Sequence, residues 1–97
     1  MSKPLTIVAI IRAREGCADR VHAHLRGLVA PSRADAGCLD YDLHVSLETP
    51  GLFLFYENWA TRADWDAHMV TPHLAAWKAA AADLVASTEI LQLEPEA

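Results

Sequence analysis

The segment from Tyr56 to Trp77 combines aromatic, acid–base and amide side chains more densely than any other part of the chain. It contains all three tryptophans and two of the five histidines, and it begins with Glu57 and Asn58 at the end of an apolar run. Imidazole titrates near neutral pH, and aromatic rings commonly wall the pockets that bind small molecules. The segment is therefore the candidate functional site of the protein.

Two histidines in this segment are the candidate bases. His68 follows Trp65 by one turn on the inner face of a predicted short helix. His73 follows Thr71 and Pro72 in the first turn of the next predicted helix, where the helix dipole favours a neutral ring. A backbone hydrogen bond for His68, and a packing or capping role for His73, are the structural alternatives.

Several neighbouring residues are candidates for the walls or polar contacts of a pocket. Trp59 ends a predicted strand and would either wall the pocket or pack against the helices. Asn58 points to the opposite side of that strand, and its amide could hold a substrate oxygen. Glu57 is interpreted instead as the structural partner of an arginine or of a helix N-terminus. The remaining candidates for substrate contact are Tyr56, Trp65, Trp77 and His44. For Tyr56 and Trp77 the alternative is a place in the hydrophobic core.

The hydrophobic pattern predicts four strands and three helical segments. Strands are predicted at residues 5–13, 38–47, 52–59 and 87–93, where apolar residues alternate or occupy both faces. A helix is predicted from residue 17, and Pro31 should kink or end it, with room for one more turn before Gly37 as a C-cap. Two further helices begin at the N-caps Thr61 and Thr71, and Asp64 completes a capping box with the first of them.

The resulting order β-α-β-β-α-β, with the second helix in two pieces, is that of a ferredoxin-like α+β fold with an antiparallel sheet. In that topology the first and third strands are central and the other two are edges. The first and third predicted strands are apolar on both faces, whereas the second and fourth are not. Helices would cover one face of the sheet, and a second copy of the chain is the simplest cover for the other. The sequence thus predicts a homodimer.

Composition limits the possible partners. The chain is predicted to be a single domain, 1–97, and 53% of its residues are apolar. Thirteen acidic and eight basic residues, with no cluster of Lys and Arg, argue against binding to nucleic acid or to an anionic membrane. Cys17 and Cys38 stand alone, as is typical of reduced thiols. The apolar run after Lys3 is too short to span a bilayer, so a cytoplasmic location is expected.

Three motifs carry a resemblance to a known family. They are RAREG at residues 12–16, GCLDYDLH at residues 37–44, and YENW followed by DWDAHMVTPHLAAW within residues 56–77. Through these motifs most of the chain resembles the antibiotic biosynthesis monooxygenase family, in its quinol-monooxygenase-like branch. The resemblance implies a dimeric α+β barrel. It also implies O2-dependent oxidation of phenols or quinols with no metal and no flavin.

A phenol or quinol reacts with O2 best as its phenolate, which requires a base, an apolar pocket and donors that steady the anion. Together with these candidate residues, the resemblance therefore implies a monooxygenase without a cofactor that acts on a quinol or on a phenolic, polyketide-like compound. His68 or His73 would remove the proton, and Asn58 would hold a substrate oxygen. A non-oxidative isomerase and a ligand-binding dimer without catalysis are the alternatives.

Two kinds of metal chemistry are disfavoured by the sequence. Haem-degrading relatives in the resembled family need an Asn on the first strand and a haem-binding His on the late helix. The first strand here has no Asn, and position 78 is Lys78. Asp40, Asp42 and His44 share one face of a straight strand, where they lie too far apart to bind one ion.

Overall fold

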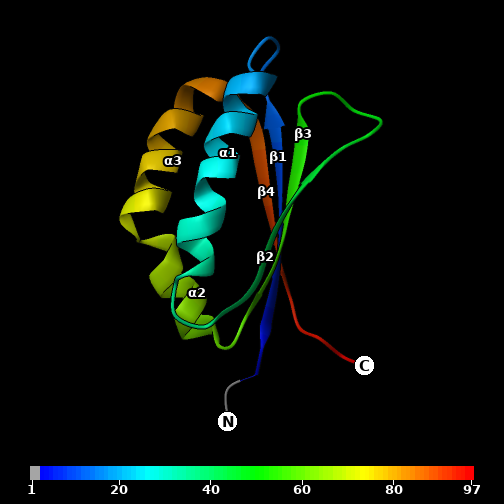
Figure 1. The fold of residues 1–97 in the computed structure, drawn as a ribbon. Helices are drawn as coiled ribbons and strands as arrows, with labels where there is room; N and C mark the ends of the chain where they lie inside the picture. Colours follow the sequence, from blue (N-terminus) through cyan, green and yellow to red (C-terminus); the bar gives the residue numbers. More distant parts are fainter. Residues whose placement is uncertain (1–2) are drawn as a thin grey trace.

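The computed structural model describes residues 3–97, and four strands and three helices follow one another within them (Figure 1). The predicted single-domain range, 1–97, includes residues 1 and 2, which lie outside the described part. No helix within residues 3–97 is long and apolar enough to cross a membrane. The elements are β1 (Leu5–Ala13), α1 (Ala18–Arg33), β2 (Cys38–Val45), β3 (Leu52–Trp59), α2 (Arg62–Met69), α3 (Pro72–Leu84) and β4 (Val85–Leu93).

The four strands form one antiparallel sheet in the order β2-β3-β1-β4. β1 and β3 are central and β2 and β4 are edges, which confirms the predicted ferredoxin-like arrangement. The register pairs Ile7 of β1 with Glu57 of β3, and Glu57 with Tyr41 of β2. Residues paired in this way project from the same face of the sheet. These three side chains therefore stand in one row.

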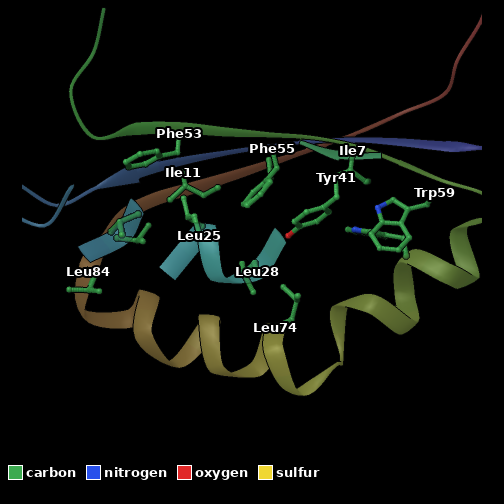
Figure 2. Close-up of a cluster of buried hydrophobic side chains, with 14 of the residues drawn as sticks. Ile7, Ile11, Leu25, Leu28, Tyr41, Phe53, Phe55, Trp59, Leu74 and Leu84 are labelled. Atoms are coloured by element: carbon green, nitrogen blue, oxygen red, sulfur yellow. The ribbon is translucent and has the colours of Figure 1, made fainter. Parts of the chain in front are cut away.

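α1 and α3 lie across one face of the sheet, and α2 continues this layer at one end (Figure 1). Figure 2 shows Ile7, Phe55 and Trp59 projecting from the strands towards this layer, where Leu28 and Leu74 meet them from the helices. All five side chains are buried. Each apolar side chain removed from water in this way stabilises the fold by roughly 1.5–3 kcal/mol. The hydrophobic core therefore lies between the sheet and the helices.

The opposite face of the sheet, called the open sheet face below, has no helix over it within residues 3–97 (Figure 1). Its central part is nevertheless apolar, and Tyr56 on this face is 42% exposed. Exposed apolar area of this kind often marks an interaction surface. The apolar side chains of the open sheet face are those of Val8, Ile10, Leu52, Leu54, Tyr56, Leu91 and Leu93.

α1 continues past Pro31 to Arg33, so the structure selects the further turn over an end at the proline, two alternatives that the sequence left open. Proline lacks the N–H that would bond to the carbonyl of Gly27, four residues earlier. Gly27 is exposed, so water can satisfy that carbonyl, and the proline lies close enough to the helix end to be tolerated. The C-cap is Ala34, and Gly37 instead adopts a positive φ of 77° in the turn before β2.

The two predicted N-caps are confirmed. The Thr61 hydroxyl accepts a hydrogen bond from the Asp64 amide at 3.1 Å, and the Asp64 carboxylate accepts one from the same hydroxyl at 2.9 Å. The Thr71 side chain accepts from the Leu74 amide at 3.4 Å. Each cap satisfies an amide that the first turn of a helix leaves without a partner. The caps thereby fix where α2 and α3 begin.

Two strand boundaries differ from the prediction. β2 ends at Val45 because Ser46 begins the turn, where its hydroxyl accepts hydrogen bonds from the amides of Glu48 and Thr49. β4 begins at Val85, two residues earlier than predicted, because α3 passes into the strand without a loop. Val85 is both the C-cap of the helix and the first strand residue, a dual role that periodicity does not reveal.

Gly37→Ala should destabilise the fold more than Gly16→Ala. Both glycines have a positive φ, of 77° and 78°, that costs an alanine about 1–2 kcal/mol. A Cβ at Gly16 meets no atom within 4 Å, whereas one at Gly37 collides with the carboxylate of Asp64. Urea unfolding should therefore show an additional loss of about 1 kcal/mol for Gly37→Ala, since it also disturbs the cap of α2. Equal losses for the two variants would contradict this assignment.

Candidate active site

A cavity of about 280 Å³ lies between the sheet and the helical layer. Most of its wall is apolar, with Ile7, Ala9 and Ile11 from β1 and Leu28 from α1. The size suits a small aromatic molecule, and the mixture of apolar walls with a few polar groups is typical of a ligand site. The aromatic and polar side chains that line the cavity are those of Tyr41, Phe55, Glu57, Trp65, His68, Trp77, Lys78 and Thr88.

His68 lies in the wall of this cavity and is 2% exposed. Its Nδ1 lies 2.8 Å from Oδ2 of Asp35. Its ring packs on Trp59, with a centroid distance of 4.5 Å, and lies edge-on to Tyr41 at 5.4 Å. Burial lowers the pKa of the imidazole, and the Asp35 carboxylate opposes this shift. The ring is therefore neutral at pH 7 and held in one orientation.

His73 belongs to the same cluster but faces a different space. Its Nε2 lies 2.9 Å from the same Asp35 oxygen, and its ring centroid is 5.9 Å from that of His68. The side chain lines an outer groove between α1 and α3, where Arg20 and His24 also lie, and it does not line the cavity. The two histidines thus meet at Asp35, while only His68 reaches the apolar cavity.

Asp35 is the residue of this cluster that sequence reasoning missed. It lies in the turn between α1 and β2, and it is separated from the two histidines by 33 and 38 positions. No periodic pattern links residues at that separation. The turn brings the carboxylate beneath α2 only because α1 continues past Pro31, which the sequence left open.

The three side chains of this cluster are also the ones that could hold a metal ion. The donor atoms of Asp35, His68 and His73 all lie within 4.8 Å of one another. Two imidazole nitrogens and one carboxylate oxygen suit first-row divalent cations. One carboxylate oxygen within hydrogen-bond distance of both imidazoles also accounts for the cluster without an ion.

Glu57 lines the cavity and is only 4% exposed, which makes it the second polar group that the sequence analysis misjudged. Its partner is the indole N–H of Trp59, which donates to Oε1 at 3.0 Å, rather than an arginine or a helix N-terminus. Burial raises the pKa of the carboxyl to about 7, against the opposing effect of the Trp59 hydrogen bond. The alternation of β3 predicts that Glu57 lies on its inner side. It does not predict that no cationic side chain within residues 3–97 pairs with the carboxyl.

The tryptophans divide between the cavity and the core. Trp65 and Trp77 line the cavity, and their contact with a ligand stays a prediction. Trp59 is completely buried behind His68 and does not itself line the cavity. It supports the ring of His68 on one side and binds Glu57 through its indole N–H. Of the two roles that the sequence offered as alternatives, Trp59 therefore takes the packing role.

Asn58, Tyr56 and His44 lie on the open sheet face, away from the cavity. Asn58 points opposite to Trp59, as the alternation predicted. Its side-chain oxygen accepts a hydrogen bond from Thr6 at 2.5 Å, and its nitrogen donates to Asp40 at 3.0 Å. The cavity of one chain therefore does not include the amide that was expected beside the two histidines.

Comparisons with known proteins agree with the motifs and the fold. The sequence profile of the family described as antibiotic biosynthesis monooxygenase matches residues 4–80. The protein named "Putative monooxygenase Rv0793" from Mycobacterium tuberculosis is 31% identical over 85 residues, which cover 88% of this chain and 83% of that protein.

Two solved structures extend this similarity to three dimensions. The crystal structure of PA3566 from Pseudomonas aeruginosa matches with a TM-score of 0.95 and 41% identity, covering 100% of this chain and 98% of that chain. The structure of Rv0793 matches with a TM-score of 0.92 and 26% identity, covering 98% of this chain and 97% of that chain. Since the family profile spans most of the sequence, this chain belongs to the antibiotic biosynthesis monooxygenase family.

Proposed function

We propose that the protein is a monooxygenase that oxidises a quinol or a phenolic, polyketide-like compound with O2 and without a cofactor. The observation that carries the proposal is the Asp35–His68 pair in the wall of an apolar cavity. Membership of the family and the similarity to a protein named a monooxygenase agree with it.

His68 is the proposed base because its two ring nitrogens have different surroundings. Asp35 accepts a hydrogen bond from Nδ1–H, which leaves the lone pair on Nε2. No protein hydrogen bond involves Nε2 within residues 3–97. Nε2 is therefore available to take the proton of a substrate hydroxyl in the cavity. His73 is disfavoured as the base because it lines the outer groove.

The proposed reaction takes its electrons from the substrate. Loss of the hydroxyl proton to His68 gives a phenolate, which is rich enough in electrons to react with O2. A ring carbon that carries hydrogen forms a C–O bond to O2, and the proton held by His68 completes a hydroperoxide. The hydroperoxide then loses water, so one oxygen atom becomes a new carbonyl and the other leaves in the water. The apolar wall excludes other water from the reacting atoms.

A non-oxidative isomerase is the second candidate, favoured by the presence of Glu57 in the same cavity. His68 would remove a proton beside a carbonyl group, and a protonated Glu57 would return one at another atom. That reaction needs no O2. Oxygen consumption therefore distinguishes the two candidates directly.

The proposed enzyme is a homodimer that joins the open sheet faces of two copies. Seven apolar side chains lie on this face, and Leu91 and Leu93 are 40% and 46% exposed. A second copy buries the same surface on both partners, as a two-fold interface requires. In such a dimer Tyr56, Asn58 and His44 lie at or beside the interface. A cytoplasmic location stays a prediction.

His68→Gln and Asp35→Asn should each lower the turnover of an accepted hydroquinone. Loss of a general base costs about 10²–10⁴-fold in kcat, and loss of the residue that orients it costs part of that factor. Wild-type turnover at saturating substrate should fall as the pH drops through the lowered pKa of His68, because the neutral ring is the active form. An oxygen electrode with a panel of hydroquinones in chelator-treated buffer measures the rates.

Two exposed or peripheral substitutions serve as controls for these variants. Asp66→Asn, on the exposed side of α2, and His22→Gln, which packs on Phe53, should retain full turnover. Full oxygen uptake in both His68→Gln and Asp35→Asn would refute the assigned base. Absence of uptake with every hydroquinone, together with isomerisation of a carbonyl compound, would favour the second candidate.

Tyr56→Glu combined with Leu91→Glu should convert the dimer into a monomer. Two charges on the open sheet face would have to lose water when the copies associate, which is costly without partners. Light scattering coupled to size-exclusion chromatography measures the mass. Ala82→Glu, on the exposed side of α3, adds a similar charge elsewhere and should leave the dimer intact. A monomeric wild-type protein would contradict the homodimer.

A further inference from the structure

Glu57 presents an oxygen atom to the cavity for which the protein supplies no partner. Oε1 accepts the hydrogen bond from the Trp59 indole, whereas Oε2 has no hydrogen-bond partner within residues 3–97. Glu57 as a whole residue is 4% exposed, and no Lys, Arg or His lies within 4.0 Å of its carboxyl in this part of the chain. Oε2 keeps some accessible surface and Glu57 lines the cavity, so a ligand in the cavity would supply the partner that the protein does not.

Protonation decides what that partner must be. A carboxylate oxygen only accepts hydrogen bonds, whereas a protonated carboxyl also donates one. Burial without a cation raises the pKa of Glu57 to about 7, so the neutral form is present at and below neutral pH. The remaining wall around Glu57 is largely apolar and offers the carboxyl proton little competition.

We propose that Glu57, as a neutral carboxylic acid, donates a hydrogen bond from Oε2 to an oxygen atom of the ligand in the cavity. This inference deepens the proposed function, on which it rests, by restricting the substrate to aromatic compounds with a second oxygen. His68 would deprotonate one hydroxyl, and Glu57 would bind a carbonyl or hydroxyl oxygen elsewhere on the ring system. Both groups line the same cavity, so one small molecule would meet both.

The other titratable groups around the cavity lie on β2, α2 and α3. On β2, burial and the Glu57 carboxylate raise the pKa of Tyr41, and burial raises that of Cys38 to about 11, so both stay neutral. On α2, burial lowers the pKa of His68, so its ring is neutral at pH 7. On α3, Lys78 donates to the carbonyl of Met69 at 3.0 Å.

The three remaining elements around the cavity supply no titratable side chain to it. β1 contributes Ile7, Ala9 and Ile11, α1 contributes Leu28, and β4 contributes Thr88 and Ile90. Glu57 is therefore the carboxyl among the cavity-lining residues, and its pKa of about 7 lies between pH 6 and pH 8.5. A pH dependence of ligand binding in that interval reports on its carboxyl.

The test compares two ligands that differ by one oxygen atom. 1-Tetralone is an aromatic ketone without a titratable group, and tetralin is the same ring system without the carbonyl. The ratio of their affinities cancels the effect of pH on the apolar cavity itself. In the wild-type protein the preference for 1-tetralone should fall about tenfold from pH 6 to pH 8.5, as the donor becomes a carboxylate. Quenching of tryptophan fluorescence and calorimetry measure the affinities.

Glu57→Gln should keep the preference for 1-tetralone and lose its pH dependence, because an amide donates a hydrogen bond at every pH. Asp66→Asn removes a carboxyl from the exposed side of α2 and should behave like the wild type. A second readout needs no variant. The infrared band of a protonated carboxyl should be present in the wild type at pH 6, should shift when 1-tetralone binds and should not shift with tetralin.

A wild-type preference that does not change with pH, or no binding of 1-tetralone, would overturn the inference. So would a Glu57→Gln variant that keeps the wild-type pH dependence. The result is separable from that of the proposed function, because binding of these ligands involves no O2 and no turnover. An active oxidase with a constant preference would reject only the role of Glu57. An inactive protein with a falling preference would reject only the monooxygenase.

Discussion

The alternation of β3 is the constraint on which both sides of this molecule depend. Phe53, Phe55, Glu57 and Trp59 point beneath the helices, and the residues between them point to the open sheet face. A shift of one residue in the register would exchange the two sets, placing Asn58 in the core and Trp59 outside. The pairing with β1 and β2 fixes this choice along the whole strand. Core, cavity and proposed dimer surface are therefore set by one strand register.

Burial acts on the two acid–base groups of the cavity in opposite directions and favours the neutral form of each. It lowers the pKa of His68 and raises that of Glu57. A neutral imidazole accepts a proton, and a neutral carboxyl donates one. The same low-polarity surroundings thus produce a base and an acid side by side at neutral pH. Asp35 modifies this balance by opposing the shift of His68 and by fixing which nitrogen carries the proton.

The sequence predicted the fold well because its signals are local. Two-sided apolar strands identified β1 and β3 as central, and Thr61 and Thr71 marked the helix starts. Pro31 was harder, since its tolerance depends on its distance from the helix end and on the exposure of Gly27. The site was predicted in part: His68, Trp65 and Trp77 follow from helical periodicity. The role of Asp35 depends on contacts between segments that are distant in the sequence. That of Glu57 depends on the lack of a cationic partner within residues 3–97. Residue spacing indicates neither.

The direct passage of α3 into β4 has a mechanical consequence. Leu84 and Val85 adjoin without a loop, so one end of α3 is fixed to an edge strand that pairs along its length with β1. The other end begins after the short break between Met69 and Pro72, which separates two helices that share few contacts. The C-terminal end of α3 is therefore fixed to the sheet. Its N-terminal end, which carries His73, is held less firmly. A widening of the cavity that moves the N-terminal end of α3 would displace His73 relative to Asp35 and His68, which lie on other segments.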